Sequence, residues 1–246
     1  MYDVNKIRAD FPILSRNVNN KPLVYLDNGS SAQKPKVVID AVSKAYSEEY
    51  SNVHRGLHTL SNLATDNYES VRGKIQNFLG AEHPEEIIFN SGATEGINTV
   101  SYSWAVPNLK AGDEIILSIM EHHANIIPWH FLRERQGVVI KWVETDENGD
   151  LDAQAVIDAI NPKTRLIAIT QMSNVLGTIT DAEKIIAKCK AAGVPTLIDG
   201  AQAVPHMKVD LDTLCCDFFA FSGHKMLAPT GIGVLWVRKS VLQTMN

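Results

Sequence analysis

The chain has 246 residues, of which 45% are hydrophobic and 21% charged, and its formal net charge at pH 7 is -5. No basic cluster is present, which argues against nucleic acid and anionic membrane surfaces as partners. The three cysteines Cys189, Cys215 and Cys216 have no metal-ligand spacing, the opening residues lack an apolar leader, and no segment has membrane-spanning length. These features predict a cytoplasmic protein without a metal site or a membrane span.

Two helices are predicted in the first third of the chain. In the segment 35–50, apolar residues recur at helical spacing behind Pro35, and a second apolar stripe ends at Leu79 before Gly80, a residue typical of helix C-caps. The polar connector SNVHRGLHTLS lies between these two stripes.

After Gly80 the pattern changes to short apolar runs that alternate with helical segments. Seven runs have the length and composition of strands: EEIIFN, DEIILSI, GVVIKWV, RLIAIT, PTLID, DFFAFS and GIGVLWVR. Several are apolar at nearly every position, as expected for strands covered on both faces. The pattern predicts an α/β fold, with a mainly parallel seven-stranded sheet and helices on both faces.

Ligands of open α/β sheets bind at the carboxyl ends of the strands, which directs attention to the polar residues there. The run IIFNSGATEG leads from a strand into a helix through Gly92, Ala93 and Thr94, whose backbone N–H groups could hold a phosphate. The alternative is an ordinary strand-to-helix turn. His122, in EHHANIIPW, could lie flat on an aromatic ring or be a surface histidine.

Two further strand ends carry a carboxylate and an amine. Asp199 follows an apolar strand, where a carboxylate needs a cation such as a protonated ring nitrogen, unless it only caps the next helix. Gln202 is within reach of the same ligand. Lys225 follows CDFFAF, in SGHK, where a desolvated amine could attack an aldehyde, unless it is a solvated turn lysine. Ser222 and His224 beside it could bind an anion.

Taken together, these residues fit pyridoxal 5′-phosphate, a cofactor that combines an aldehyde, a pyridine ring and a phosphate. A nucleotide-binding α/β protein is the alternative, although the glycine fingerprint of that class is missing.

The order GATEG, EHHANIIPW, SNVLG, DGAQ and SGHK resembles the class V aminotransferase-like enzymes of fold type I, and most closely the SufS-type cysteine desulfurases and selenocysteine lyases. YLDNGSSAQKP and NVHRGLHTLS resemble the same group. EHHANIIPW and NVHRG count against the alternatives of a kynureninase-like hydrolase or an aminotransferase.

The resemblance implies a role for each of these residues. Lys225 is expected to bind the cofactor covalently and to move protons, and Asp199 to pair with the pyridine nitrogen. His122 is expected to stack on the ring and, as a second catalytic residue, to assist proton transfer. The remaining contacts are expected from Gln202 to the phenolic oxygen, from Ala93, Thr94, Ser222 and His224 to the phosphate, from Asn174 to the substrate, and from His54 and Arg55 at the entrance, Arg55 toward a partner subunit.

The resemblance also implies a homodimer that converts L-cysteine, or L-selenocysteine, and passes sulfur to an acceptor protein for iron–sulfur cluster assembly. Members of this group carry a smaller C-terminal domain with the nucleophilic cysteine, which the 246 residues do not contain. We therefore expect an N-terminal arm at 1–20 and a cofactor-binding large domain at 21–246, inactive alone in sulfur transfer. The alternative is an inert fragment or a module that binds the acceptor.

Overall fold

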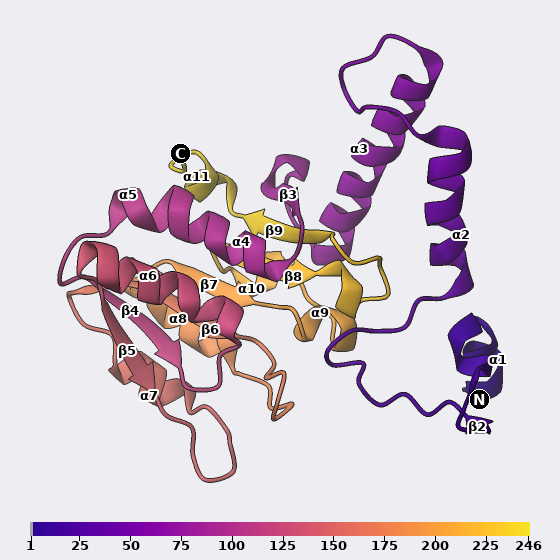
Figure 1. The fold of residues 1–246 in the computed structure, drawn as a ribbon. Coiled ribbons are helices and arrows are strands. Elements are labelled where there is room, and N and C mark those ends of the chain that lie inside the picture. Colours follow the sequence, from indigo (N-terminus) through magenta and orange to yellow (C-terminus); the bar gives the residue numbers. More distant parts are fainter. Residues whose placement is uncertain (1) are drawn as a thin grey trace.

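The computed structural model describes residues 2–246, and a seven-stranded sheet forms its centre (Figure 1). In spatial order the strands are β3 (Ile87–Asn90), β9 (Gly233–Val237), β8 (Phe218–Ser222), β7 (Thr196–Asp199), β6 (Thr164–Thr170), β4 (Glu114–Ser118) and β5 (Val139–Val143). The five strands from β8 to β5 are mutually parallel, whereas β9 is antiparallel to both of its neighbours, β3 and β8. The predicted mainly parallel seven-stranded sheet is confirmed.

Helices cover both faces of this sheet (Figure 1). One face packs against α4 (Ala93–Thr99), its π-helical continuation Val100–Ala105, α6 (Ile127–Gln136) and α11 (Lys239–Leu242). The short helix α5 (Val106–Asn108) follows the π-helical segment. The other packs against α7 (Ala153–Asp158), α8 (Ala182–Ala192), α9 (Ala203–His206) and α10 (Leu211–Leu214). Successive strand residues alternate between the two cores, so that Phe218 lies in one and Phe219 in the other.

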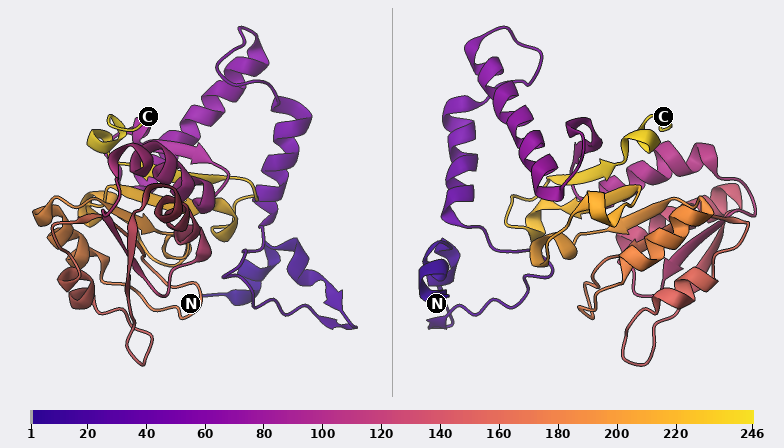
Figure 2. Two further views of the ribbon diagram at one scale, coloured as in Figure 1. Left: turned by 60° about the vertical axis from the view of Figure 1, so that its left-hand side comes forward. Right: turned by 180° about the vertical axis from the view of Figure 1, so that it is seen from behind.

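A helical hairpin projects from this body (Figures 1 and 2). It consists of α2 (Lys36–Lys44), which continues as a π-helical turn over Ala45–Glu49, and α3 (Thr59–Leu79). Both predicted helices are confirmed, and Gly80 ends α3 with φ 65°. No residue of α2 is buried. The apolar stripe that predicted this helix therefore has no core to pack against within residues 2–246.

The N-terminal segment lies beside the base of the hairpin (Figure 2). It contains α1 (Val4–Ala9), a 3₁₀ turn at Pro12–Ser15 and a small hairpin of β1 (Asn17–Val18) and β2 (Lys21–Pro22). Three further 3₁₀ turns, Pro84–Glu86, His123–Asn125 and Gly223–Lys225, precede β3, precede α6 and follow β8 respectively. None of the helices within residues 2–246 combines the length and apolarity needed to cross a membrane.

Candidate functional site

A cavity of about 480 Å³ lies at the carboxyl ends of the central strands. Eight of the residues singled out from the sequence line it: Ala93, Thr94, His122, Asn174, Asp199, Ser222, His224 and Lys225. They come from five separate strand ends, those of β3, β4, β6, β7 and β8. Neighbouring parallel strands end at the same edge of a sheet, which explains why residues more than a hundred positions apart share this cavity.

Lys225 belongs to the 3₁₀ turn Gly223–Lys225 after β8. Burial lowers the pKa of its amine, and the negative charge of Asp199 partly offsets this effect. A larger fraction of the amine is therefore neutral near pH 7 than for an ordinary lysine, as a nucleophile requires. The backbone of the turn is fixed from the N-terminal segment, because the Ala32 N–H and the Lys34 ammonium both donate to the His224 carbonyl.

Asp199, the last residue of β7, has only 4% of its surface exposed. Burial raises the pKa of its carboxyl, while the Ala201 N–H at 2.9 Å, the positive charge of Lys225 and, when its ring is protonated, the charge of His122 act against this rise. A carboxyl in this position gains from a cation placed in the same cavity, because the cation offsets the cost of burying its charge.

His122 follows β4 and caps the 3₁₀ turn His123–Asn125. The Ala124 N–H donates to its Nδ1 over 3.1 Å, which leaves Nε2 to carry the proton of the neutral ring. Burial and then the charge of Lys225 lower the pKa of this imidazole. The ring is therefore mostly neutral near pH 7.

The loop before α4 provides an anion-binding shape. Gly92 has φ 152°, and a Cβ at this position would lie 3.2 Å from Ser222 Oγ, so glycine keeps the loop close to β8. The Ala93 N–H donates to Ser222 Oγ over 2.9 Å. Thr94 and His224 also line the cavity. Burial, followed by the charges of Lys225 and Lys34, lowers the pKa of His224.

The donor set fits pyridoxal 5′-phosphate, since it combines an amine for the aldehyde, a buried carboxyl for the ring nitrogen, an imidazole for the ring face and several donors for the phosphate. Gln202 does not line the cavity. Its amide instead donates to the carbonyl of Gly29, which does. Gln202 therefore fixes a part of the cavity wall in this chain.

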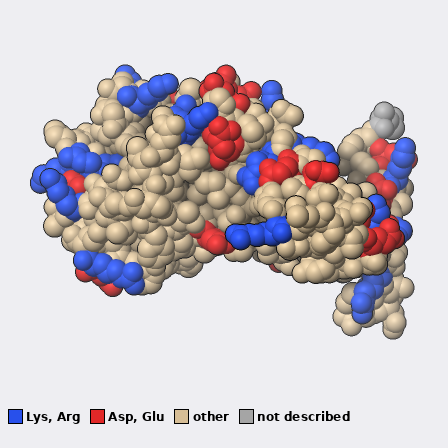
Figure 3. All heavy atoms as spheres, turned by 90° about the horizontal axis from the view of Figure 1, so that it is seen from above, with Lys and Arg blue, Asp and Glu red and all other residues tan. Residues whose placement is uncertain are grey.

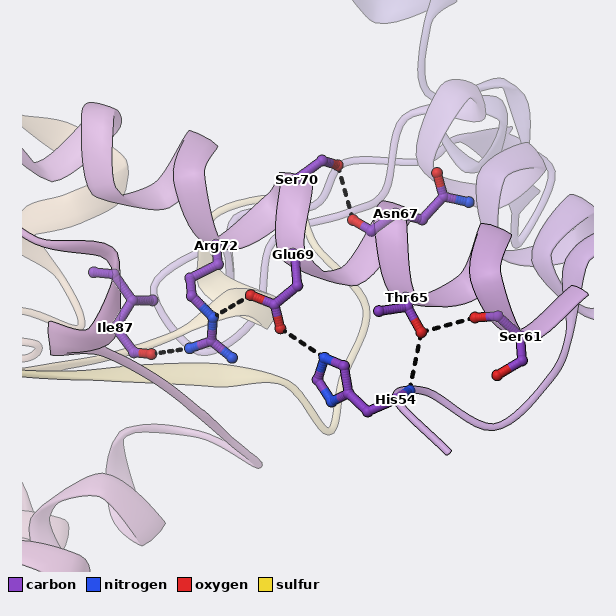
Figure 4. Close-up of polar contacts among 8 residues, drawn as sticks. All are labelled: His54, Ser61, Thr65, Asn67, Glu69, Ser70, Arg72 and Ile87. Atoms are coloured by element: carbon purple, nitrogen blue, oxygen red, sulfur yellow. Dashed lines mark hydrogen bonds and ion pairs between the residues drawn. The ribbon is translucent and has the colours of Figure 1, made fainter. Parts of the chain in front are cut away.

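His54 and Arg55 lie outside this cavity, in the connector between α2 and α3. The His54 N–H donates to Thr65 Oγ1, and its Nε2 lies 3.0 Å from Glu69 Oε1 (Figure 4). Arg72 completes this network by donating to Glu69 and to the carbonyl of Ile87 (Figure 4). His54 is thus held at the projecting hairpin, and neither His54 nor Arg55 lines the cavity of its own chain.

Sequence reasoning missed other residues of the cavity wall. Leu26, Asp27, Gly29 and Ser30 come from the N-terminal segment, and Ala124 and Ala201 from the turns after β4 and β7. The motif YLDNGSSAQKP contains the first four, but this irregular stretch has no strand or helix pattern from which to infer its position. Tyr25 shapes it by donating to the carbonyls of Asp27 and Ser31.

Three comparisons with known proteins agree with this geometry. Residues 24–246 match the aminotransferase class-V family. The cysteine desulfurase of Enterobacter sp. (strain 638) is 50% identical over 244 residues, which are 99% of this chain and 60% of the relative. The cysteine desulfurase of Salmonella typhi has the same identity and coverage. The chain therefore spans about 60% of the length of these relatives.

Solved structures give the same result. The cysteine desulfurase CsdA from Escherichia coli superposes with a TM-score of 0.88 at 36% identity, and the apo cysteine desulfurase from Thermococcus onnurineus NA1 with 0.92 at 35%. Each comparison covers 100% of this chain and 60% of the other. Class V aminotransferases and cysteine desulfurases are dependent on pyridoxal 5′-phosphate, which confirms the cofactor predicted from the sequence. By its sequence and its fold, the chain belongs to the aminotransferase class-V family.

Proposed function

We propose that this chain forms the cofactor-binding part of a cysteine desulfurase, which removes sulfur from L-cysteine and leaves alanine. The observation that carries the proposal is the shared cavity of Lys225, Asp199 and His122. The lowered pKa of Lys225 favours a neutral amine, and the raised pKa of Asp199 means that a nearby cation would stabilise its ionised carboxylate.

Each residue has a specific part in this proposal. Lys225 would hold the cofactor through Nζ and move the proton of the substrate α-carbon. Asp199 would keep a proton on the pyridine nitrogen, and His122 would cover one ring face. Thr94, Ser222, His224 and the backbone at Ala93 would hold the phosphate, and Asn174 would face the substrate carboxylate. Gln202 would keep Gly29 in place in the cavity wall through its bond to the Gly29 carbonyl. Bound pyridoxal phosphate supplies an electron sink for charge that develops on the substrate.

The cysteines of the described residues do not supply the sulfur nucleophile. Cys189 and Cys216 are buried, none of the three cysteines lines the cavity, and burial raises the pKa of Cys189 to about 12. A thiol must ionise to attack sulfur. We therefore propose that sulfur is taken by a cysteine outside residues 2–246 and passes from that cysteine to an acceptor protein. We also propose that the protein is located in the cytoplasm.

A homodimer is part of the proposal. The accessible surface is 13600 Å², whereas a compact protein of 27.1 kDa exposes about 11,000 Å². Much of the projecting hairpin is apolar and exposed, including Val37 (72%), Tyr46 (73%) and Tyr50 (71%). We propose that a second subunit covers this hairpin and that His54 and Arg55 reach the entrance of the partner's cavity.

We also propose that the chain is divided into an N-terminal arm at 1–20 and a cofactor-binding large domain at 21–246.

Charge on the surface agrees with a small-molecule substrate. On the face shown in Figure 3, basic and acidic side chains are interspersed, and no broad field of one sign is visible. Nucleic acid is therefore not part of the proposal.

Borohydride reduction tests the cofactor site directly. The purified protein is loaded with pyridoxal 5′-phosphate, reduced and digested, and the modified peptide is identified by mass spectrometry. We expect one stable adduct, on Lys225, which Lys225→Ala abolishes and Lys36→Ala at an exposed helix leaves intact. An adduct on another lysine, or none in a folded protein, would refute the proposed site. Alanine release from L-cysteine and from L-selenocysteine by the whole protein then identifies the substrate.

A further inference from the structure

A second carboxyl, that of Glu121, lies buried beside the cavity. It directly precedes His122, and only 7% of its surface is exposed. Among residues 2–246, no cation is close enough to form an ion pair with it, and burial raises its pKa to about 7. Burying an acidic group without a cation is costly, so its position calls for an explanation.

Three donors from three different segments converge on this carboxyl. Ser118 Oγ, at the end of β4, and the Thr170 N–H, at the end of β6, both donate to Oε1, the latter over 3.0 Å. Asn125 Nδ2 donates to Oε2 over 2.8 Å, and Asn125 Oδ1 in turn accepts from Trp129 Nε1 over 3.1 Å. Glu121 therefore connects two strand ends of the cavity with the start of α6.

The same network surrounds the backbone of His122. Asn125 also donates its backbone N–H to the His122 carbonyl over 2.8 Å, so Glu121 and Asn125 enclose the His122 backbone from both sides. Thr170 pairs in register with Asp199, and its hydroxyl lies 3.4 Å from the Asp199 carbonyl. One carboxyl thus connects the strand end before His122 with the strand next to Asp199.

We propose that Glu121 is a positioning residue of this site, which holds the His122 imidazole over the cavity and fixes it relative to Asp199. The role of this imidazole toward the cofactor rests on the proposed function, whereas its position rests on the hydrogen bonds described above. A proton on Oε1 can be directed at Ser118 Oγ, since the hydroxyl can rotate, so both protonation states keep the bonds from Asn125 and Thr170. A glutamine at position 121 cannot keep both bonds. In either orientation of its amide, the NH₂ group faces one of the two N–H donors, Asn125 Nδ2 or the Thr170 backbone.

Glu86 provides a matched control. It is also buried, with 3% exposed, and it also accepts three bonds, from the backbone N–H groups of His83 and Lys239 and from Trp236 Nε1. It does not line the cavity. Glu86→Gln should therefore cost similar stability through the same chemistry, without an effect on His122.

The experiment compares Glu121→Gln with Glu86→Gln by two measurements. The first is the pKa of His122 in the cofactor-free protein, from an NMR titration of its ring protons. The charged groups facing this ring are Lys225, Asp199 and His123, and neither variant alters them. We expect the pKa of His122 to rise toward its ordinary value in Glu121→Gln, because a released ring enters water, and to stay unchanged in Glu86→Gln.

The second measurement is the visible circular dichroism of the bound cofactor, which depends on how the ring is held. We expect Glu121→Gln to lower this signal at least twofold, and Ser118→Ala, which removes a single donor, to give a smaller change of the same kind. If Glu121→Gln loses stability as Glu86→Gln does but changes neither signal, Glu121 is only structural and the proposal is overturned. If the wild-type protein binds no cofactor, the proposed function fails, while the NMR titration still decides the role of Glu121.

Discussion

A glycine at the start of β9 is expected to control both stability and the shape of the phosphate end of the cavity. Gly233 pairs with Asn90 of β3 on one side and with Ser222 of β8 on the other. A Cβ at this position would lie 2.4 Å from Gly92 Cα, 2.7 Å from the Phe221 carbonyl oxygen and 2.8 Å from Asn90 Oδ1. Two of these three atoms belong to the backbone, so a rotamer change cannot remove the clash.

The expected cost follows from this geometry. Forcing an extra methyl group into a packed interior costs about 1–3 kcal/mol, and rigid backbone neighbours place Gly233→Ala near the top of this range. For a chain of this length each kcal/mol lowers the melting temperature by about 2–4 °C, which gives a decrease of about 6–12 °C. The strands must also separate at Gly92, so affinity for pyridoxal 5′-phosphate should fall.

Gly73→Ala is the matched control, with the opposite sign. Gly73 lies inside α3 and has nothing within 4 Å of its Cβ position. Alanine there should raise the free energy of unfolding by about 0.5–1 kcal/mol, because it restricts the unfolded chain. Thermal and urea unfolding, followed by cofactor titration, measure both variants. A Gly233→Ala protein as stable as the wild type, or one with unchanged cofactor affinity, would refute the reasoning.

Three further predictions concern the core, pH and the hairpin connector. Phe218→Ala should lower the free energy of unfolding, measured in urea, by about 3–5 kcal/mol, because this fully buried ring packs edge-on against Trp104 with 5.4 Å between the ring centroids. A decrease below about 1 kcal/mol would contradict this prediction. Because the pKa of Glu121 rises on folding from 4.5 to about 7, its stabilising contribution is complete below about pH 4.5 and is lost as the pH rises through 7. Between pH 4.5 and 7, the free energy of unfolding of the wild type should therefore fall by ~3 kcal/mol relative to that of Glu121→Gln. If the two proteins give parallel plots of unfolding free energy against pH, this prediction is wrong. Glu69→Gln should speed hydrogen exchange of the amide of His54 while global stability changes little, since exposed ion pairs contribute little. Unchanged exchange there would contradict the network of Figure 4.

The parts of the site that could be predicted from the sequence are those that local pattern determines. An apolar run predicts a buried strand, and the residue after it lies at the edge where ligands bind, so Asp199 and Lys225 could be identified without coordinates. Strands β7 and β8 are parallel neighbours, with Asp199 paired in register with Ala220, and this brings both residues to one cavity.

Other parts depend on contacts between distant segments and could not be predicted in this way. The insertion of β9 between β3 and β8 results from strand pairing, which no local pattern encodes. Glu121 has the appearance of a surface residue in EHHAN, because its burial depends on Thr170, 49 positions away. The projecting position of α2 has the same origin, since an amphipathic stripe predicts a helix without identifying the surface that covers it.

One physical cause explains the chemistry of the whole cavity. Burial is the largest influence on each of its shifted groups, and it lowers the pKa of Lys225, His122 and His224 while it raises that of Asp199 and of Glu121 beside it. Bases and acids are thus driven toward their neutral forms by the same desolvation. A neutral amine is needed to react with an aldehyde, and a carboxyl that is costly to ionise alone is stabilised most by a ligand that brings its own positive charge. The strand ends of this sheet therefore favour a ligand that carries both an electrophilic carbonyl and a protonated ring.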